Sequence, residues 1–193
     1  MERQGAAPGA VTEDGTLDAL TTIVSALVLL AAVSYVWAEF RHMEPATLLM
    51  FAMMTFLTPG LLVASVAMLA IAIAMLVFLR RSRYRASIAL SFALMLAGGA
   101  LVALASMPLS NDWPALSRLF GNSMGFVRAS FMADGMALAI WGATTALLSV
   151  AARRASRRGS PSASALRWLA AVPTLLAACV FVLMALVMGI KGR

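Results

Sequence analysis

Long apolar stretches separated by short arginine-rich segments occupy most of this 193-residue chain. A soluble core cannot bury several apolar runs of about 18 or more residues, each of which is long enough to cross the hydrocarbon layer of a membrane as a helix. Composition agrees, since 62% of the residues are hydrophobic and only 12% are charged, against about 25% charged in soluble domains. The sequence therefore predicts an all-α integral membrane protein.

A single transmembrane domain is predicted over residues 18–193, preceded by a mobile cytoplasmic tail at residues 1–17. Its five spans are expected at about residues 20–37, 60–79, 86–107, 129–152 and 166–190. The first span is expected to be a retained helix, because the segment before it is acidic whereas a cleaved signal peptide begins with a basic region. Thr16 and Asp18 precede this span, where they are expected to cap the start of the helix.

An additional half-helix is predicted at about residues 46–57, after the first span. The apolar run over residues 46–79 would be about 50 Å long as one helix, against a hydrocarbon layer of about 30 Å. Thr58, Pro59 and Gly60 supply a break, since proline lacks a backbone donor and glycine relaxes the backbone. The segment before the break reaches only about 18 Å, so it is expected to be interfacial or re-entrant.

Two arginine clusters set the predicted orientation, because short loops rich in Arg or Lys usually face the cytoplasm. The expected cytoplasmic anchors are Arg80, Arg81, Arg83, Arg85, Arg153, Arg154, Arg157 and Arg158. Two spans separate the clusters, so both fall on one side, with the N-terminus in the cytoplasm and the C-terminus outside. Lys191 and Arg193 then lie on the unfavoured side, which leaves the opposite orientation open. The second cluster could also bind anionic lipid or be phosphorylated.

Several polar residues would meet on the outer side in this topology. The predicted outer-face platform comprises Glu39, Arg41, His42, Glu44, Asp112, Trp113, Arg118 and Arg128. The segment 108–127 carries aromatic and aliphatic residues among polar ones, as interfacial segments do. The alternative interpretation is that charges accumulate wherever loops meet water.

Asp134 is the acidic residue that this topology places inside a predicted span. A charged carboxylate there is costly, so the group should be neutral, face the bundle or a wet crevice, or pair with a cation. Arg128 is a poor partner because it lies on another face of the same helix. The better candidates are Arg41, His42 and Arg118. A proton-coupling or ligand-binding role competes with an interhelical hydrogen bond and with a span that begins deeper.

Small residues mark the predicted helix-packing positions. Gly135, Ala139, Gly142 and Ala146 recur at spacings of four, three and four, and Gly98 and Gly99 form a second such point. Small side chains let another helix approach closely in a membrane. Whether the partner helix belongs to this chain or to another subunit is left open.

Motifs for catalysis or metal binding are missing from the sequence: there is no HExxH, no phosphate-binding glycine loop and no GxSxG. The single histidine, His42, cannot supply a three-histidine zinc site. Cys179 has no second cysteine to pair with, and it is expected to be a small packing residue. We therefore expect no catalytic residues, no metal, no cofactor and no nucleic-acid partner.

The leading functional prediction is a non-catalytic subunit or accessory component of a larger complex in a bacterial inner membrane. Its expected partners are the lipid bilayer and either other membrane-protein subunits or further copies of the chain. The first alternative is a small proton-coupled transporter or channel that uses Asp134. The second is an enzyme that modifies outer-leaflet lipid, with His42 beside Glu39 and Glu44 as its acid or base.

Overall fold

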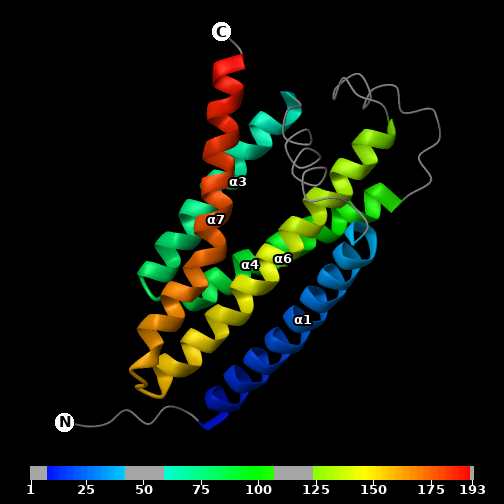
Figure 1. The fold of residues 1–193 in the computed structure, drawn as a ribbon. Helices are drawn as coiled ribbons and strands as arrows, with labels where there is room; N and C mark the ends of the chain where they lie inside the picture. The colour runs from blue at the N-terminus through cyan, green and yellow to red at the C-terminus, as the bar shows by residue number, and fades with distance from the viewer. Residues whose placement is uncertain (1–7, 42–58, 107–123, 192–193) are drawn as a thin grey trace.

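The computed structural model describes residues 8–41, 59–106 and 124–191, which form helices and the turns between them (Figure 1). The helices of this part of the chain are α1 (Pro8–Phe40), α3 (Pro59–Arg80), α4 (Tyr84–Ser106), α6 (Met124–Arg157) and α7 (Ser162–Lys191). Four of them contain stretches long and apolar enough to cross a membrane: Gly15–Ala38, Tyr84–Ser106, Phe131–Arg157 and Ser162–Cys179. The predicted all-helical class is thus confirmed. A crossing by α3, and with it the count of five spans, stays a prediction.

The first helix starts earlier than the sequence predicts. It begins at Pro8, so residues 8–17 are helical where an irregular tail was expected. Proline suits a first turn because its missing N–H would be unpaired there anyway. Asp18 therefore lies well inside α1, and the prediction that Thr16 and Asp18 cap the helix start is wrong.

The predicted proline break after the first span coincides with a helix start. α3 begins at Pro59, in the Thr58–Gly60 segment expected to interrupt the apolar run. Here too proline occupies a first-turn position that needs no backbone donor. The predicted half-helix at 46–57 lies outside the described residues.

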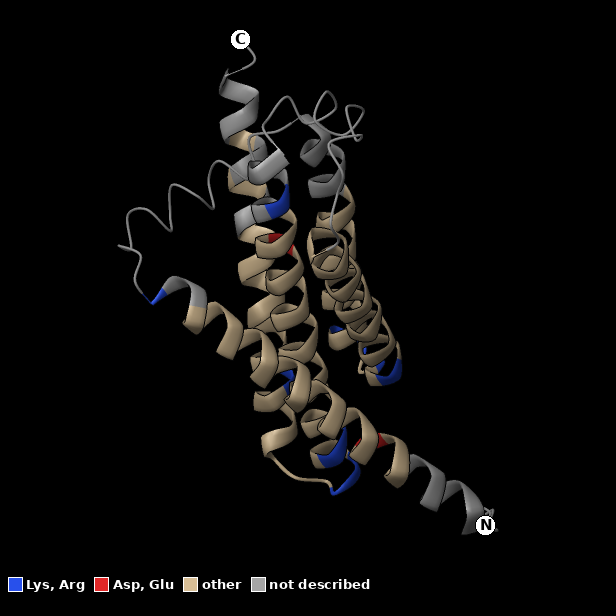
Figure 2. Cartoon of the chain, turned by 90° about the vertical axis from the view of Figure 1, so that its right-hand side faces the viewer, with Lys and Arg blue, Asp and Glu red and all other residues tan. Residues whose placement is uncertain are grey.

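α6 is the central helix of the bundle. It packs against α4, α7 and α1, while α3 packs against α7 and α4. Inside the bundle, 61% of the apolar stretch of α6 is buried, whereas only 17% of the apolar stretches of α1 and α7 is buried. Helices α3, α4, α6 and α7 thus form a four-helix group, and α1 packs on its outside. Figure 2 shows α1 crossing the other helices obliquely, as suits a 33-residue helix about 50 Å long in a layer of about 30 Å.

Large side chains from several helices fill the four-helix group. Met75 of α3 and Leu94 of α4 pack with Leu138 and Trp141 of α6. The indole Nε1 of Trp141 donates a hydrogen bond to Thr174 Oγ1 of α7 at 3.1 Å. A buried indole N–H needs such an acceptor. The bond therefore holds α7 against the face of α6 that carries Trp141.

Both arginine-rich turns close in the same way. Arg83 N–H donates to the carbonyl five residues earlier at 2.8 Å, and Ser160 N–H does so at 3.0 Å. Ser82, with φ of 55°, and Gly159, with φ of 64°, occupy the left-handed position of each turn. This arrangement is the Schellman motif, which ends a helix tightly. The two turns are therefore short and tightly closed, and they lie at the same end of the bundle (Figure 1).

Candidate functional site

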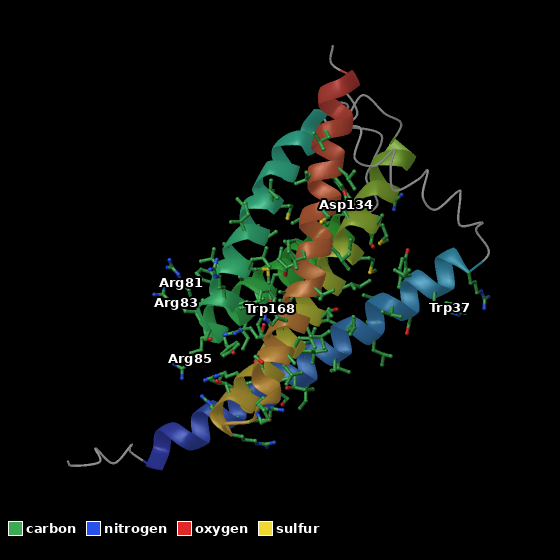
Figure 3. The ribbon with its side chains drawn as sticks, turned by 60° about the vertical axis from the view of Figure 1, so that its left-hand side comes forward. Trp37, Arg81, Arg83, Arg85, Asp134 and Trp168 are labelled. Atoms are coloured by element: carbon green, nitrogen blue, oxygen red, sulfur yellow. The ribbon has the colours of Figure 1, made fainter. Side chains whose placement is uncertain are left out.

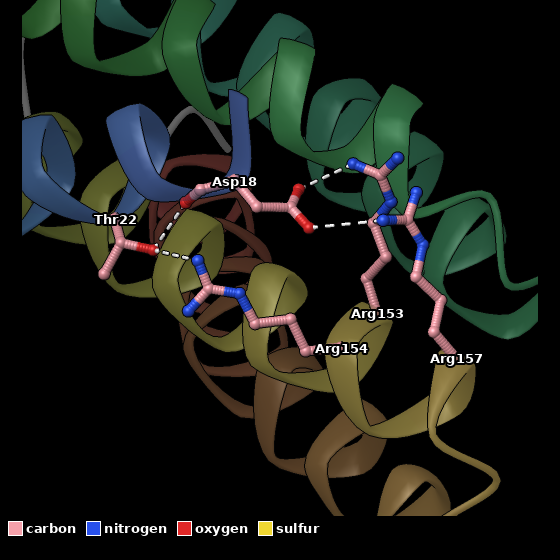
Figure 4. Close-up of polar contacts among 5 residues, drawn as sticks. All are labelled: Asp18, Thr22, Arg153, Arg154 and Arg157. Atoms are coloured by element: carbon pink, nitrogen blue, oxygen red, sulfur yellow. Dashed lines mark hydrogen bonds and ion pairs between the residues drawn. The ribbon is translucent and has the colours of Figure 1, made fainter. Parts of the chain in front are cut away.

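A buried ion pair joins α1 to α6 at the end of the bundle that carries the arginine-rich turns (Figure 4). Arg153 Nη1 donates to Asp18 Oδ1 at 2.7 Å, and Arg157 Nη1 lies 3.7 Å from Asp18 Oδ2. Asp18 is 3% exposed and Arg153 is 8% exposed. Charges removed from water to this extent must compensate each other, because an unpaired buried charge is strongly destabilising. The pair therefore fixes where α1 meets α6.

Thr22 extends this contact one turn along α1. Its Oγ1 donates to the Asp18 carbonyl oxygen at 2.7 Å and accepts a longer hydrogen bond from Arg154 Nη2 at 3.4 Å. We call the five residues Asp18, Thr22, Arg153, Arg154 and Arg157 the Asp18 cluster. It engages three arginines of α6 with two residues of α1, so it also sets which face of α1 turns toward α6.

Sequence reasoning missed the Asp18 cluster. Arg153, Arg154 and Arg157 were predicted as cytoplasmic anchors, yet Arg153 is buried and pairs with Asp18. A signal was present, because Asp18, Thr21, Thr22 and Ser25 recur at helical spacing on one face of an otherwise apolar segment. Polar residues in a span almost always face other helices, so this stripe predicts a face that packs against a partner.

Small hydroxyl side chains continue the polar contact into the bundle. Thr21 and Ser25 of α1 are buried. Ser87 of α4 and Ser149 of α6 share a hydrogen bond between their Oγ atoms at 3.1 Å, and Ser91 Oγ donates to the Ser87 carbonyl at 2.8 Å. Hydroxyl groups in lipid are stabilised by bonds across helices or to their own backbone. These contacts are part of the helix packing.

The predicted stripe of small residues packs against α4 of the same chain. A Cβ atom added to Gly98 would lie 2.5 Å from the Gly135 carbonyl oxygen, and one added to Gly142 would lie 2.6 Å from that of Ser91. Ala139 and Ala146 of the same stripe are buried. The question that the sequence left open is thereby answered: α4 covers this stripe, which leaves it unable to dock another subunit.

Two other predicted packing positions face outward. A Cβ atom added to Gly99 would meet nothing within 4 Å. Cys179, which was expected to be a small packing residue, is exposed on α7. Neighbouring residues of an α-helix point in different directions, which explains why Gly98 packs and Gly99 does not.

Asp134 lies on α6, toward the end of the bundle away from the arginine-rich turns (Figure 3). It is about 28 Å from Arg153 along the helix axis at 1.5 Å per residue, close to the thickness of a hydrocarbon layer of about 30 Å. If Arg153 marks one boundary of that layer, Asp134 lies near the other. Trp141 and Thr145, both buried, follow it on one helix face. That face points into the four-helix group.

No cation within the described residues lies at ion-pair distance from the Asp134 carboxylate. Of the partners predicted for it, Arg41 is described and exposed but forms no ion pair with it. His42 and Arg118 lie outside the described residues. The predicted pairing of Asp134 with a cation therefore stays a prediction.

The predicted outer-face platform can be compared with the structure at few positions. Arg41 is exposed just after α1. Arg128 Nε donates to the Ala105 carbonyl oxygen at 2.9 Å and so ties the start of α6 to the end of α4. Glu39 belongs to α1, but its side chain is not described. The remaining members lie outside the described residues: His42, Glu44, Asp112, Trp113 and Arg118.

The long apolar helices indicate a membrane-embedded α-helical protein, and among the described residues the Asp18 cluster is the polar site with the most interhelical contacts. Comparison with protein-family models, with curated proteins and with solved structures finds no match. A function therefore has to follow from the residues and their geometry.

Proposed function

We propose that this chain is a non-catalytic subunit of a larger complex in a bacterial inner membrane, which it crosses five times. In this proposal the arginine-rich turns and the N-terminus face the cytoplasm and the C-terminus faces outside, because arginine favours the cytoplasmic side. The supporting observation is a regular row of side chains on the exposed face of α1. This row takes the place of the Gly135 and Gly142 stripe as the proposed partner-binding surface, because α4 of the same chain covers that stripe.

This row, the α1 seam, runs nearly the length of the apolar part of the helix. Its members are all exposed: Leu20 (58%), Ile23 (58%), Leu27 (61%), Leu30 (66%), Ser34 and Trp37 (72%). Their spacing alternates between three and four residues. This spacing keeps side chains along one side of a helix and lets them interlock with a second helix.

The opposite face of α1 packs against the rest of the bundle. Asp18, Thr21, Ser25 and Ala32 follow a similar spacing and are all buried. Because the Asp18 cluster fixes the rotation of α1, the α1 seam is held outward. In the second half of the seam, Ser34 adds a small hydroxyl group. Such a group can form a hydrogen bond with a neighbouring helix and so favours helix association in a membrane. These features support a transmembrane helix of a partner protein as the occupant of the seam.

The proposal predicts that two leucines of the α1 seam hold the partner. In the variant Leu27→Ala/Leu30→Ala, the amount of partner that stays bound after gentle detergent extraction is expected to fall about tenfold. Native mass spectrometry of the tagged protein measures this, with foreign subunits at fixed stoichiometry expected for the parent chain. The matched control is Leu176→Ala/Leu183→Ala on α7, where the two side chains are 63% and 60% exposed.

Retention in the control should equal that of the parent. A lone chain or a complex containing only copies of itself would contradict the subunit proposal. Equal loss from both variants would show that any exposed leucines matter alike, and would remove the α1 seam as the docking surface.

A second function, a small proton-coupled transporter or channel, is favoured by one observation. Asp134 shares its helix face with Thr145, whose Oγ1 is fully buried and has no hydrogen-bond partner in the described part of the chain. In this proposal protons would pass from Asp134 along the side of α6 that faces α3 and α7. The side that faces α4 is closed, because α4 and α6 are in backbone contact at Gly98 and Gly135. The lipid-modifying enzyme predicted around His42 gains no such support from the described residues.

For this second function, Asp134→Asn is expected to lower proton flux at least about tenfold, as removal of an essential relay group would. Proteoliposomes that contain a pH-sensitive dye measure the flux. Asp134→Glu, which keeps a carboxyl group, should retain most of it. Equal flux from the Asn variant and the parent would exclude Asp134 as the coupling group.

A further inference from the structure

The end of the bundle that carries the arginine-rich turns is stepped. Arg167 Nη1 donates to Ser82 Oγ at 3.2 Å, so the turn between α3 and α4 lies beside the second turn of α7. Because α7 begins at Ser162, the turn between α6 and α7 extends about 7 Å further at 1.5 Å per residue. Figure 1 also shows the turn between α6 and α7 extending beyond the turn between α3 and α4. We call the recessed level the basic shelf: Arg80, Arg81, Arg83, Arg85 and Arg167.

The basic shelf carries a concentrated positive charge. Arg80, Arg81, Arg83 and Arg85 are exposed, and Figure 3 labels the last three. No acidic side chain of the described chain lies within ion-pair distance of Arg80, Arg81 or Arg83, since Asp18 is taken up by arginines of α6. The Schellman turn at Ser82 holds the backbone that carries them. The shelf thus presents several closely spaced guanidinium groups to an anion.

Exposed apolar side chains lie directly beneath these arginines. On α3, Ile73 and Val77 are 53% and 39% exposed and lead at a spacing of four to Arg81. On α7, Trp168 and Val172 are 67% and 44% exposed and follow Arg167 along the helix. The two helices are neighbours. An anion on the shelf would therefore sit above a surface suited to acyl chains, with a tryptophan at the level where lipid headgroups meet the hydrocarbon.

We propose that the basic shelf binds the phosphate headgroup of an anionic phospholipid, whose acyl chains lie along the exposed faces of α3 and α7. Arginine suits this task because its planar guanidinium can donate two parallel hydrogen bonds to phosphate oxygens. A soluble phosphate would use the same donors. It would leave the apolar surface beneath them uncovered, and for this reason a lipid is the better occupant.

The test compares lipids on the purified full-length protein by native mass spectrometry. The parent chain is expected to retain phosphatidylglycerol in preference to phosphatidylcholine. In Arg81→Gln/Arg83→Gln, phosphatidylglycerol retention should fall roughly thirtyfold, since each arginine near a headgroup contributes to anionic-lipid binding. The matched control is Arg41→Gln/Arg158→Gln, which removes the same charge elsewhere and should retain the lipid. Arg81→Lys/Arg83→Lys keeps the charge but loses the paired hydrogen bonds of the planar guanidinium groups, so its retention should fall between those of the parent and the Gln variant.

Three outcomes would overturn the proposal. Equal retention of the two lipids would show that the shelf does not select an anionic headgroup. Equal loss from the control would show that net charge matters and this site does not. Displacement of the lipid by inorganic phosphate at the same concentration would identify a phosphate site in place of a lipid site. Thermal unfolding of each variant confirms that it is folded. If the Gln variant is not folded, the Lys variant tests the site instead, and retention equal to that of the parent would then contradict the proposal.

Discussion

Asp18→Ala is expected to destabilise the folded protein by about 3–5 kcal/mol, the usual cost of removing one partner from a buried ion pair. Most of this cost arises at Arg153, a residue that is 8% exposed and would keep its buried charge after losing the hydrogen bond to the Asp18 carboxylate. Arg157 would lose a partner too, but its side chain is 44% exposed and water can replace the lost contact. Unfolding in a titration of sodium dodecyl sulfate into mild detergent measures the change in the free energy of unfolding.

A double variant separates the ion pair from a general effect of substitution at this position. Asp18→Leu/Arg153→Met removes both buried charges and fills the space with apolar atoms, so it should recover most of the lost stability. Arg158→Ala, in the exposed turn after α6, should change stability by less than about 0.5 kcal/mol. If Asp18→Ala matched that exposed control, the Asp18 cluster would not be holding α1 to α6.

Hydropathy alone located the helices, because lipid imposes a strong requirement on long apolar segments. Four of the five predicted spans lie within the described helices, and the fifth, 86–107, extends one residue beyond the end of α4 at Ser106. α3 begins at Pro59, one residue from the expected start. The ends were harder to predict because polar residues near a boundary tolerate either helix or loop. α1 illustrates this, since its first turns are helical from Pro8 and its Asp18 has a partner on α6 that is distant in sequence.

The candidate site was predicted only in part, because spacing within one helix identifies a face but does not name its partner. The stripe through Gly135 and Gly142 was recognised as a close-packing surface, yet only the fold places Gly98 of α4 against it. The arginine clusters were recognised as lying on one side. That Arg153 turns inward while Arg81 stays exposed depends on where α1 and α7 pack.

Gly98→Ala is expected to destabilise the protein by about 3 kcal/mol, whereas Gly99→Ala should stabilise it by up to about 1 kcal/mol. A methyl group on Gly98 would lie 2.5 Å from the Gly135 carbonyl oxygen and 2.9 Å from the Ala139 backbone nitrogen. Both atoms belong to the backbone of α6, so the clash is relieved only if α4 and α6 move apart. The same methyl group on Gly99 meets nothing within 4 Å, and alanine is the better helix former.

The opposite signs expected at two adjacent glycines make this comparison sensitive to the α4–α6 contact itself. Intrinsic helix propensity would favour alanine at both positions, so only the interhelical contact can reverse the sign at Gly98. Thermal unfolding in detergent, followed by circular dichroism, measures both variants under one condition. Stabilisation by both would mean that α4 and α6 do not approach to backbone contact, and the Gly135 stripe would then again be available to a partner subunit.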